Sequence, residues 1–171
     1  MFLGFLKRKT LKKIVNKDLP KVNTSSKNKV KTVGLLIDGT RFVHIDKLVE
    51  ELVGFGLEKK NIKVLVYLDK KSKDTTWSYF RLKDISLTKK TTHMGREVKA
   101  FENEPFDLLV NYYHQKQIAL TYLGIQLKAD FKVGFASEEK QINDLVIDLP
   151  LLDYQLFAKE LYKYLKLFNK L

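Results

Sequence analysis

Three polar side chains stand where short apolar runs of the sequence stop. Asp38 directly follows the run at residues 33–37, and Asn111 and His114 lie at or just past the end of another run at 106–111. Ligands of open α/β sheets bind at the carboxyl ends of the strands. If the two strands are neighbours, the three side chains converge on a pocket for a small ligand, or on a vestige of one. Ordinary polar loop residues are the alternative interpretation.

The segment Asp38-Gly39-Thr40 invites comparison with the haloacid dehalogenase-like phosphatases, whose first strand ends in Asp-x-Asp-Gly-Thr. The first Asp of that motif is the nucleophile, and here its position holds Leu36. A leucine side chain does not attack phosphorus, so this phosphatase chemistry is excluded. We expect instead that Asp38 and Gly39 form a turn between strand and helix, and that Thr40 caps the following helix.

Other common catalytic patterns are missing from the sequence. It has no Gly-x-Gly-x-x-Gly or Walker loop to cradle a phosphate, and no serine in a nucleophile elbow. The chain has no cysteine, which excludes disulfide-linked partners and thiolate metal sites. Its histidines are dispersed, without the spacing of metal ligands: His44, His93 and His114. We therefore expect no metal, no cofactor and no enzymatic activity of the isolated protein.

An aromatic and basic cluster lies in the middle of the chain. Its aromatic members are Trp77, Tyr79 and Phe80, and its cations are Lys70, Lys71, Lys73, Arg81 and Lys83. Stacking of unpaired bases on aromatic rings within a basic surface is a common mode of RNA binding. The alternative is that the aromatic residues belong to the core and the lysines are solvated.

Positive charge is concentrated at the start of the chain. The formal net charge is +12, of which residues 1–32 carry +9, from ten Lys or Arg and one Asp. Such a segment favours a polyanionic partner. We predict an RNA-binding accessory protein associated with the ribosome or its precursors, without readout of DNA sequence. The residues expected to bind RNA are Lys7, Arg8, Lys9, Lys12, Lys13, Lys17, Lys21, Lys27, Lys29, Lys31, Trp77 and Arg81.

A second hypothesis places the basic segment on an anionic membrane surface. Residues 2–17 have apolar side chains at roughly helical spacing among the lysines, so Phe2, Leu3, Phe5 and Leu6 would enter the lipid interface. No apolar run is long enough to span a bilayer. The charges at residues 7–9 follow the first apolar residues instead of preceding them, unlike a secretory signal, so we expect a cytoplasmic protein.

Apolar runs alternate with segments of helical periodicity, which predicts an α/β fold. We expect one domain at 31–171, a three-layer α/β/α sandwich of Rossmann-like or flavodoxin-like type with a mainly parallel sheet. A basic arm and linker at 1–30, helical over 2–17, precede it. Residues 69–104 are the least readable, with a weak extended pattern near Ile85. The predicted strands are 33–37, 62–68, 106–111, 131–136 and 145–148, and the predicted helices are 42–55, 116–127 and 151–168.

Three segments of the second half carry a resemblance to known proteins. They are Phe106-Asp-Leu-Leu-Val-Asn111, Ala129-Asp-Phe-Lys-Val-Gly134 and Asn143-Asp-Leu-Val-Ile-Asp148, followed by an aromatic-rich final helix. The pattern resembles a small uncharacterised bacterial family, a domain of unknown function, over nearly the whole chain, and this resemblance implies no known activity. The first two segments are also similar to the acceptor half of two-domain Rossmann-like sugar transferases. A third hypothesis is therefore a small-ligand-binding or degenerate transferase-like domain.

Overall fold

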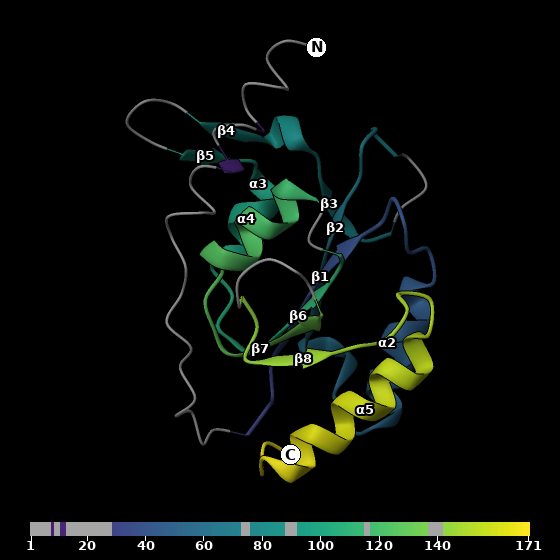
Figure 1. Cartoon of the computed structure of the whole chain (residues 1–171). Helices are drawn as coiled ribbons and strands as arrows, with labels where there is room; N and C mark the ends of the chain where they lie inside the picture. Colours follow the sequence, from purple (N-terminus) through teal and green to yellow (C-terminus); the bar gives the residue numbers. More distant parts are fainter. Residues whose placement is uncertain are drawn as a thin grey trace.

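Six strands form one parallel sheet in the order β3-β2-β1-β6-β7-β8, shown in Figure 1. This computed structural model describes residues 8, 11–12, 29–72, 76–87, 92–114, 117–136 and 142–171. The strands of the sheet are β1 (Val33–Asp38), β2 (Ile62–Tyr67), β3 (Ser78–Phe80), β6 (Phe106–Tyr112), β7 (Ala129–Phe135) and β8 (Leu145–Ile147). The helices are α2 (Ile45–Gly54), α3 (Arg96–Glu102), α4 (Ile118–Gln126) and α5 (Tyr154–Leu167). An antiparallel hairpin of β4 (Ile85–Leu87) and β5 (Thr92–Met94) lies outside the sheet.

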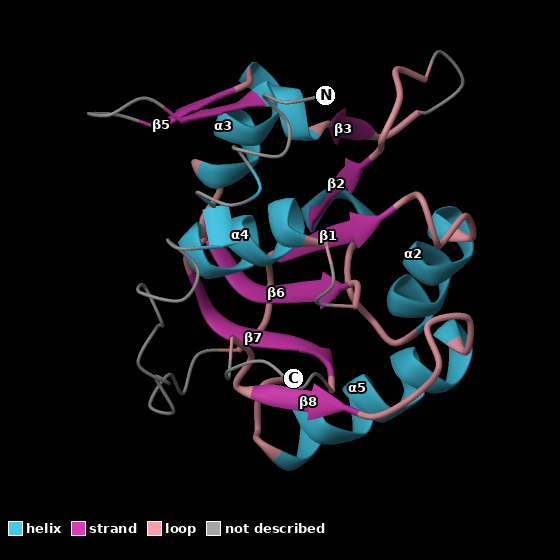
Figure 2. Cartoon of the chain, turned by 45° about the horizontal axis from the view of Figure 1, so that its top comes forward, coloured by secondary structure: helices cyan, strands magenta, loops and turns pink. Residues whose placement is uncertain are grey.

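The sheet is covered on both faces, as Figure 2 shows, which gives the predicted α/β fold. Strand β1 is central, and all six of its residues are buried, as expected for an apolar run between two layers. Its side chains alternate, so that Leu35 faces the layer of α2 and α5 and Leu36 faces the layer of α3 and α4. The Rossmann-like or flavodoxin-like arrangement is thus confirmed.

The loop between β1 and α2 differs from the prediction. Helix α2 begins at Ile45 rather than at residue 42, and its N-cap residue makes no side-chain capping bond. The Thr40 hydroxyl instead donates to Asp38 Oδ1 at 2.6 Å, and the Thr40 N–H donates to the same oxygen at 3.0 Å. Thr40 therefore closes the turn itself and does not cap the helix. At the other end α2 stops at Gly54, and Gly56, just past the C-cap residue, has φ +98°, a left-handed conformation that favours glycine.

The segment that the sequence left least readable contains short elements. Strand β3 has three residues and pairs with β2 at the edge of the sheet. A 3-10 turn, η2 (Leu82–Asp84), leads into the β4–β5 hairpin, and the seven-residue α3 then packs beside β3. None of the helices in the described part of the chain is both long and apolar enough to cross a membrane.

Two described residues of the N-terminal segment, Leu11 and Val30, pack into the core. Leu11 is 0% exposed and belongs to the cluster that includes Phe80, Ile85 and Phe101. Its helical neighbours Arg8 and Lys12 are exposed. Residues 2–7, with which the membrane hypothesis is mainly concerned, lie outside the described residues.

Replacing Leu11 by alanine should therefore destabilise the domain. Loss of a buried leucine side chain typically costs about 2–5 kcal/mol, whereas Lys12→Ala, on the same helical turn, should have little effect. Urea unfolding of the full chain measures both. Equal free energies of unfolding for the two variants would show that Leu11 is not part of the core.

Lys132 of β7 generates a pH-dependent prediction. Its side chain is 8% exposed, and its Nζ donates to the Gly124 carbonyl at 2.9 Å, near the end of α4. Burial lowers the pKa of Lys132 from 10.5 to about 8, while the charge of Asp144 opposes this change. The folded state therefore carries a penalty for the protonated amine that is complete below the folded pKa and disappears as the pH rises through 10.5.

Relative to Lys132→Met, the wild-type chain should therefore gain stability between pH 7 and pH 10. With each pKa unit equivalent to about 1.4 kcal/mol, the gain should be about 2 kcal/mol. Urea unfolding at the two pH values measures it, with Lys128→Met, an exposed lysine, as the control. A difference that does not change with pH would contradict the assigned pKa.

Candidate nucleic-acid interface

A cavity of about 470 Å³ lies along the edge strand β3. Residues 76–81 line it from the strand, and the beginning of α3 lines it from the opposite side. We call it the β3–α3 cavity. The side chains used in the argument below belong to Trp77, Ser78, Tyr79, Arg81, Asp84, Arg96 and Glu97.

The aromatic residues of the predicted cluster have different positions. Phe80 is 1% exposed and lies in the core beneath α3 and α4. Trp77 and Tyr79 are half-buried, packing against the opposite core layer while also lining the cavity. Phe80 thus has the core role of the alternative interpretation, whereas Trp77 and Tyr79 also present surface to the cavity.

Arg81 is fixed by a carboxylate three residues further along the chain. Its N–H donates to Asp84 Oδ2 at 2.9 Å, and its side chain donates to the same carboxylate through Nε at 3.2 Å and a terminal nitrogen at 3.4 Å. The guanidinium carbon lies 6.0 Å from the centre of the Tyr79 ring. Short local contacts therefore hold a cation beside an aromatic ring at the cavity wall.

A second arginine–carboxylate pair comes from α3. Arg96 donates to Glu97 Oε1 through Nε at 3.4 Å and a terminal nitrogen at 3.3 Å. The Ser78 hydroxyl, from β3, donates to Glu97 Oε2 at 3.0 Å. The Arg96 side chain is 93% exposed, so this pair is weak as an ion pair, but it leaves a cation at the mouth of the cavity.

The N-terminal segment reaches the same end of the molecule. Burial raises the pKa of the Tyr67 hydroxyl, a hydrogen bond to Asp69 raises it further, and the positive charge of Arg8 opposes both effects. Arg8 is therefore within electrostatic range of Tyr67, whose ring lies 5.4 Å from that of Phe80. Because Phe80 also lines the cavity, Arg8 and the cavity share one region of the domain.

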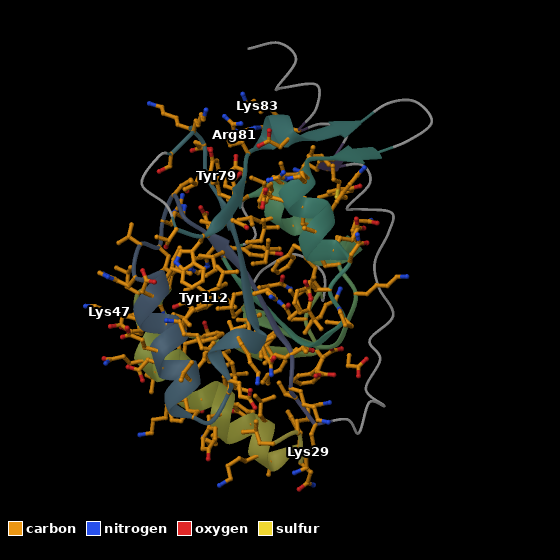
Figure 3. All side chains as sticks on the ribbon, turned by 180° about the vertical axis from the view of Figure 1, so that it is seen from behind. Lys29, Lys47, Tyr79, Arg81, Lys83 and Tyr112 are labelled. Carbon is orange, nitrogen blue, oxygen red and sulfur yellow. The ribbon has the colours of Figure 1, made fainter. Side chains whose placement is uncertain are left out.

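Two of the lysines expected to bind RNA lie elsewhere. Figure 3 shows Lys29 at the opposite end of the molecule from Arg81 and Lys83. The Lys29 amine donates to the backbone oxygen of Leu171 at 2.5 Å. The backbone N–H of Lys31 donates to Asp107 Oδ2 at 2.8 Å. The other arm lysines of the prediction lie outside the described residues: Lys7, Lys9, Lys13, Lys17, Lys21 and Lys27.

The three strand-end residues lie in different surroundings. Strands β1 and β6 are neighbours, as the hypothesis required. However, Asp38 is 1% exposed and accepts the hydrogen bonds of its own turn. Asn111 is buried, and its amide group donates to Asn143 Oδ1 at 2.7 Å. His114 is exposed and lies beside Phe135, which belongs to the core layer of α2 and α5. Each of the three side chains thus has a different environment.

Among the described residues, no three His, Asp or Glu side chains are grouped closely enough to hold a metal ion. Sequence reasoning identified Trp77 and Arg81 but missed Asp84 and Glu97 as partners in a site. The sequence does contain a local signal for the role of Asp84, since a carboxylate three residues after Arg81 suits a 3-10 turn. It contains no such signal for Glu97, because only the packing of α3 against β3 brings this side chain to the cavity.

The chain belongs to a family described as "Family of unknown function (DUF6913)", which matches residues 7–168. This confirms the resemblance to an uncharacterised family, and the bacterial origin stays a prediction. No curated protein and no solved structure matches the chain, so the similarity to sugar transferases stays an expectation.

Replacing Asp84 by alanine should loosen the cavity wall. The variant loses the acceptor of one backbone and two side-chain bonds from Arg81, and bonds to a charged group contribute about 1.5–3 kcal/mol. We expect a loss of stability of that order in urea unfolding. Lys99→Ala, which removes an exposed side chain of α3, is the control. A loss no larger than that of the control would show that Asp84 does not hold Arg81.

Proposed function

We propose that this protein is an RNA-binding accessory protein, without catalytic chemistry of its own, that acts on the ribosome or its precursors. The observation that carries the proposal is the β3–α3 cavity, where half-buried aromatic rings and two guanidinium groups line one hollow. Aromatic rings stack on unpaired bases, and guanidinium groups bind phosphates. An unpaired stretch of RNA presents both groups together, whereas in a duplex the bases are already stacked.

The N-terminal segment would add affinity that does not depend on base sequence. Arg8 and Lys12 are exposed on one helical turn, and buried Leu11 holds that turn against the domain. Cations placed on phosphates release counterions, so each phosphate contact makes binding more sensitive to salt. The cavity would then set the position of the RNA, and the basic segment would strengthen its binding.

The ribosome is the favoured partner because of how charge is distributed. Residues 33–171 have 22 Lys or Arg and 19 Asp or Glu, so +9 of the net charge of +12 lies in the preceding segment. A nearly balanced body with a strongly basic extension suits a large folded RNA, on which the body rests while the extension follows phosphates. Proteins that bind free RNA by charge alone do not need this separation between a nearly neutral body and a basic extension.

Docking on an anionic membrane remains the alternative hypothesis. Leu11 is an apolar residue of the same predicted helix, 2–17, as the residues that would enter the lipid, and it is buried in the protein core. An amphipathic helix needs its apolar face to enter the membrane interface. The observation therefore favours RNA over lipid as the polyanion.

Sedimentation of a native lysate on sucrose gradients tests the proposal. We expect the full chain to migrate with a ribosomal subunit at low salt and to be released at high salt. Arg8→Ala combined with Lys12→Ala should be released at a lower salt concentration, since two phosphate contacts are lost. The matched control is Lys47→Ala combined with Lys159→Ala, which removes two exposed lysines from the opposite layer. Figure 3 shows Lys47 away from Arg81.

Two results would contradict the proposal. Migration only with free protein at low salt would exclude a ribosomal partner. Co-sedimentation with anionic vesicles but not with neutral ones, together with no binding to RNA, would favour the membrane hypothesis instead. Release of the two double variants at the same salt concentration would show that the N-terminal turn does not contact phosphate.

A further inference from the structure

The β3–α3 cavity has the size of a site for one small ligand. Pockets for small molecules typically have volumes of about 300–1,000 Å³, and this one has about 470 Å³. A single nucleotide is of that class, whereas a duplex is far too large. If RNA enters, it does so as one unpaired nucleotide turned into the cavity.

Two carboxylates line the cavity, and they differ in how firmly their arginine donors are held, since the Arg81 side chain is largely buried and the Arg96 side chain is exposed. Asp84 is engaged by three bonds from Arg81, one of them from the backbone. Glu97 accepts from Ser78 on one oxygen and from Arg96 on the other. A carboxylate has about four acceptor positions, so the oxygen that accepts one bond from Ser78 retains capacity for a further donor. The other oxygen accepts two bonds from the exposed Arg96 side chain and becomes available when Arg96 turns to a phosphate. The Ser78 hydroxyl of β3 sets the direction of the carboxylate.

An oriented carboxylate discriminates between the bases. Guanine presents two adjacent N–H donors on its Watson–Crick edge, at N1 and at the N2 amino group, which together match the two oxygens of a carboxylate. Adenine, cytosine and uracil each place an acceptor next to the donor, and that acceptor would face a negative oxygen. The Glu97 side chain is 41% exposed, so the discrimination comes from repulsion between that acceptor and the carboxylate and not from burial.

We propose that the β3–α3 cavity binds one unpaired guanine nucleotide, with the base edge donating to Glu97 and the phosphate near Arg96. This assignment rests on the proposed RNA-binding function and names the base that the cavity prefers. The half-buried ring of Tyr79, with Arg81 beside it, lines the wall against which the base would stack. Arg96, at the mouth, is the cation free enough to meet a phosphate.

The fluorescence of Trp77 reports directly on the cavity. Trp77 is the only tryptophan of the chain, and it lines the cavity. The full chain is titrated with GMP, IMP, AMP, CMP and UMP, and with short single-stranded RNAs that contain or lack guanine. IMP is the decisive comparison with GMP, since it differs only by the absence of the N2 amino group.

We expect GMP to change the fluorescence at the lowest concentration. IMP should bind roughly tenfold more weakly, as expected for one lost bond to a charged acceptor, and the other three more weakly still. Glu97→Gln should abolish the preference for GMP, because its amide group places a donor opposite the donors of guanine. Glu102→Gln, at the exposed end of the same helix, should keep the preference.

The outcomes separate this inference from the function on which it rests. RNA binding that changes Trp77 fluorescence with no preference for guanine overturns the guanine site and leaves the RNA-binding proposal standing. A guanine preference for nucleotides without any binding of RNA upholds the site and overturns the RNA function. No response to nucleotides or to RNA overturns both. A GMP preference that survives in Glu97→Gln overturns the role of Glu97.

Discussion

Two apolar faces of a parallel sheet have to be removed from water, and the rest of the described structure depends on how this is done. Strand β1 is buried along its whole length, so both faces of the sheet have to be covered by other elements at this strand. Helices α2 and α5 cover one face, and α3 and α4 cover the other with help from Leu11. The covering ends at the edge strand β3, which pairs on one side only, and there the cavity forms.

The same constraint explains why the candidate site lies at an edge. The strand order changes direction between β1 and β6, where open α/β sheets commonly bind ligands. Here Asp38 is used by its own turn and Asn111 bonds to Asn143 within the core. Those polar groups therefore stabilise the fold at that position. At β3 the polar groups of Arg81 and Glu97 instead border open space, where a ligand has access to them.

Elements with a long apolar run or a full helical period were predictable from the sequence. Strands β1, β2, β6 and β7 and helices α2, α4 and α5 are of this kind, with ends that differ from the predicted ones by at most three residues. Strand β8 has only three residues but was predicted, at 145–148, from its apolar run. Strand β3 was missed because its three residues follow a polar, basic segment, and helix α3 because seven residues are too few to show a helical period. Trp77 and Arg81 were predicted from their composition, but Glu97 joins them only through tertiary packing. The burial of Leu11 was equally invisible, since apolar spacing alone does not say what an arm packs against.

Ultraviolet cross-linking of the full chain to single-stranded RNA, followed by mass spectrometry of the cross-linked peptide, tests the central claim most directly. The claim is that RNA meets the domain at the edge strand β3. A nucleotide attached to the peptide that contains Trp77, Tyr79 and Arg81 is the predicted result. Cross-links confined to the layer of α2 and α5, with none on that peptide, would contradict it.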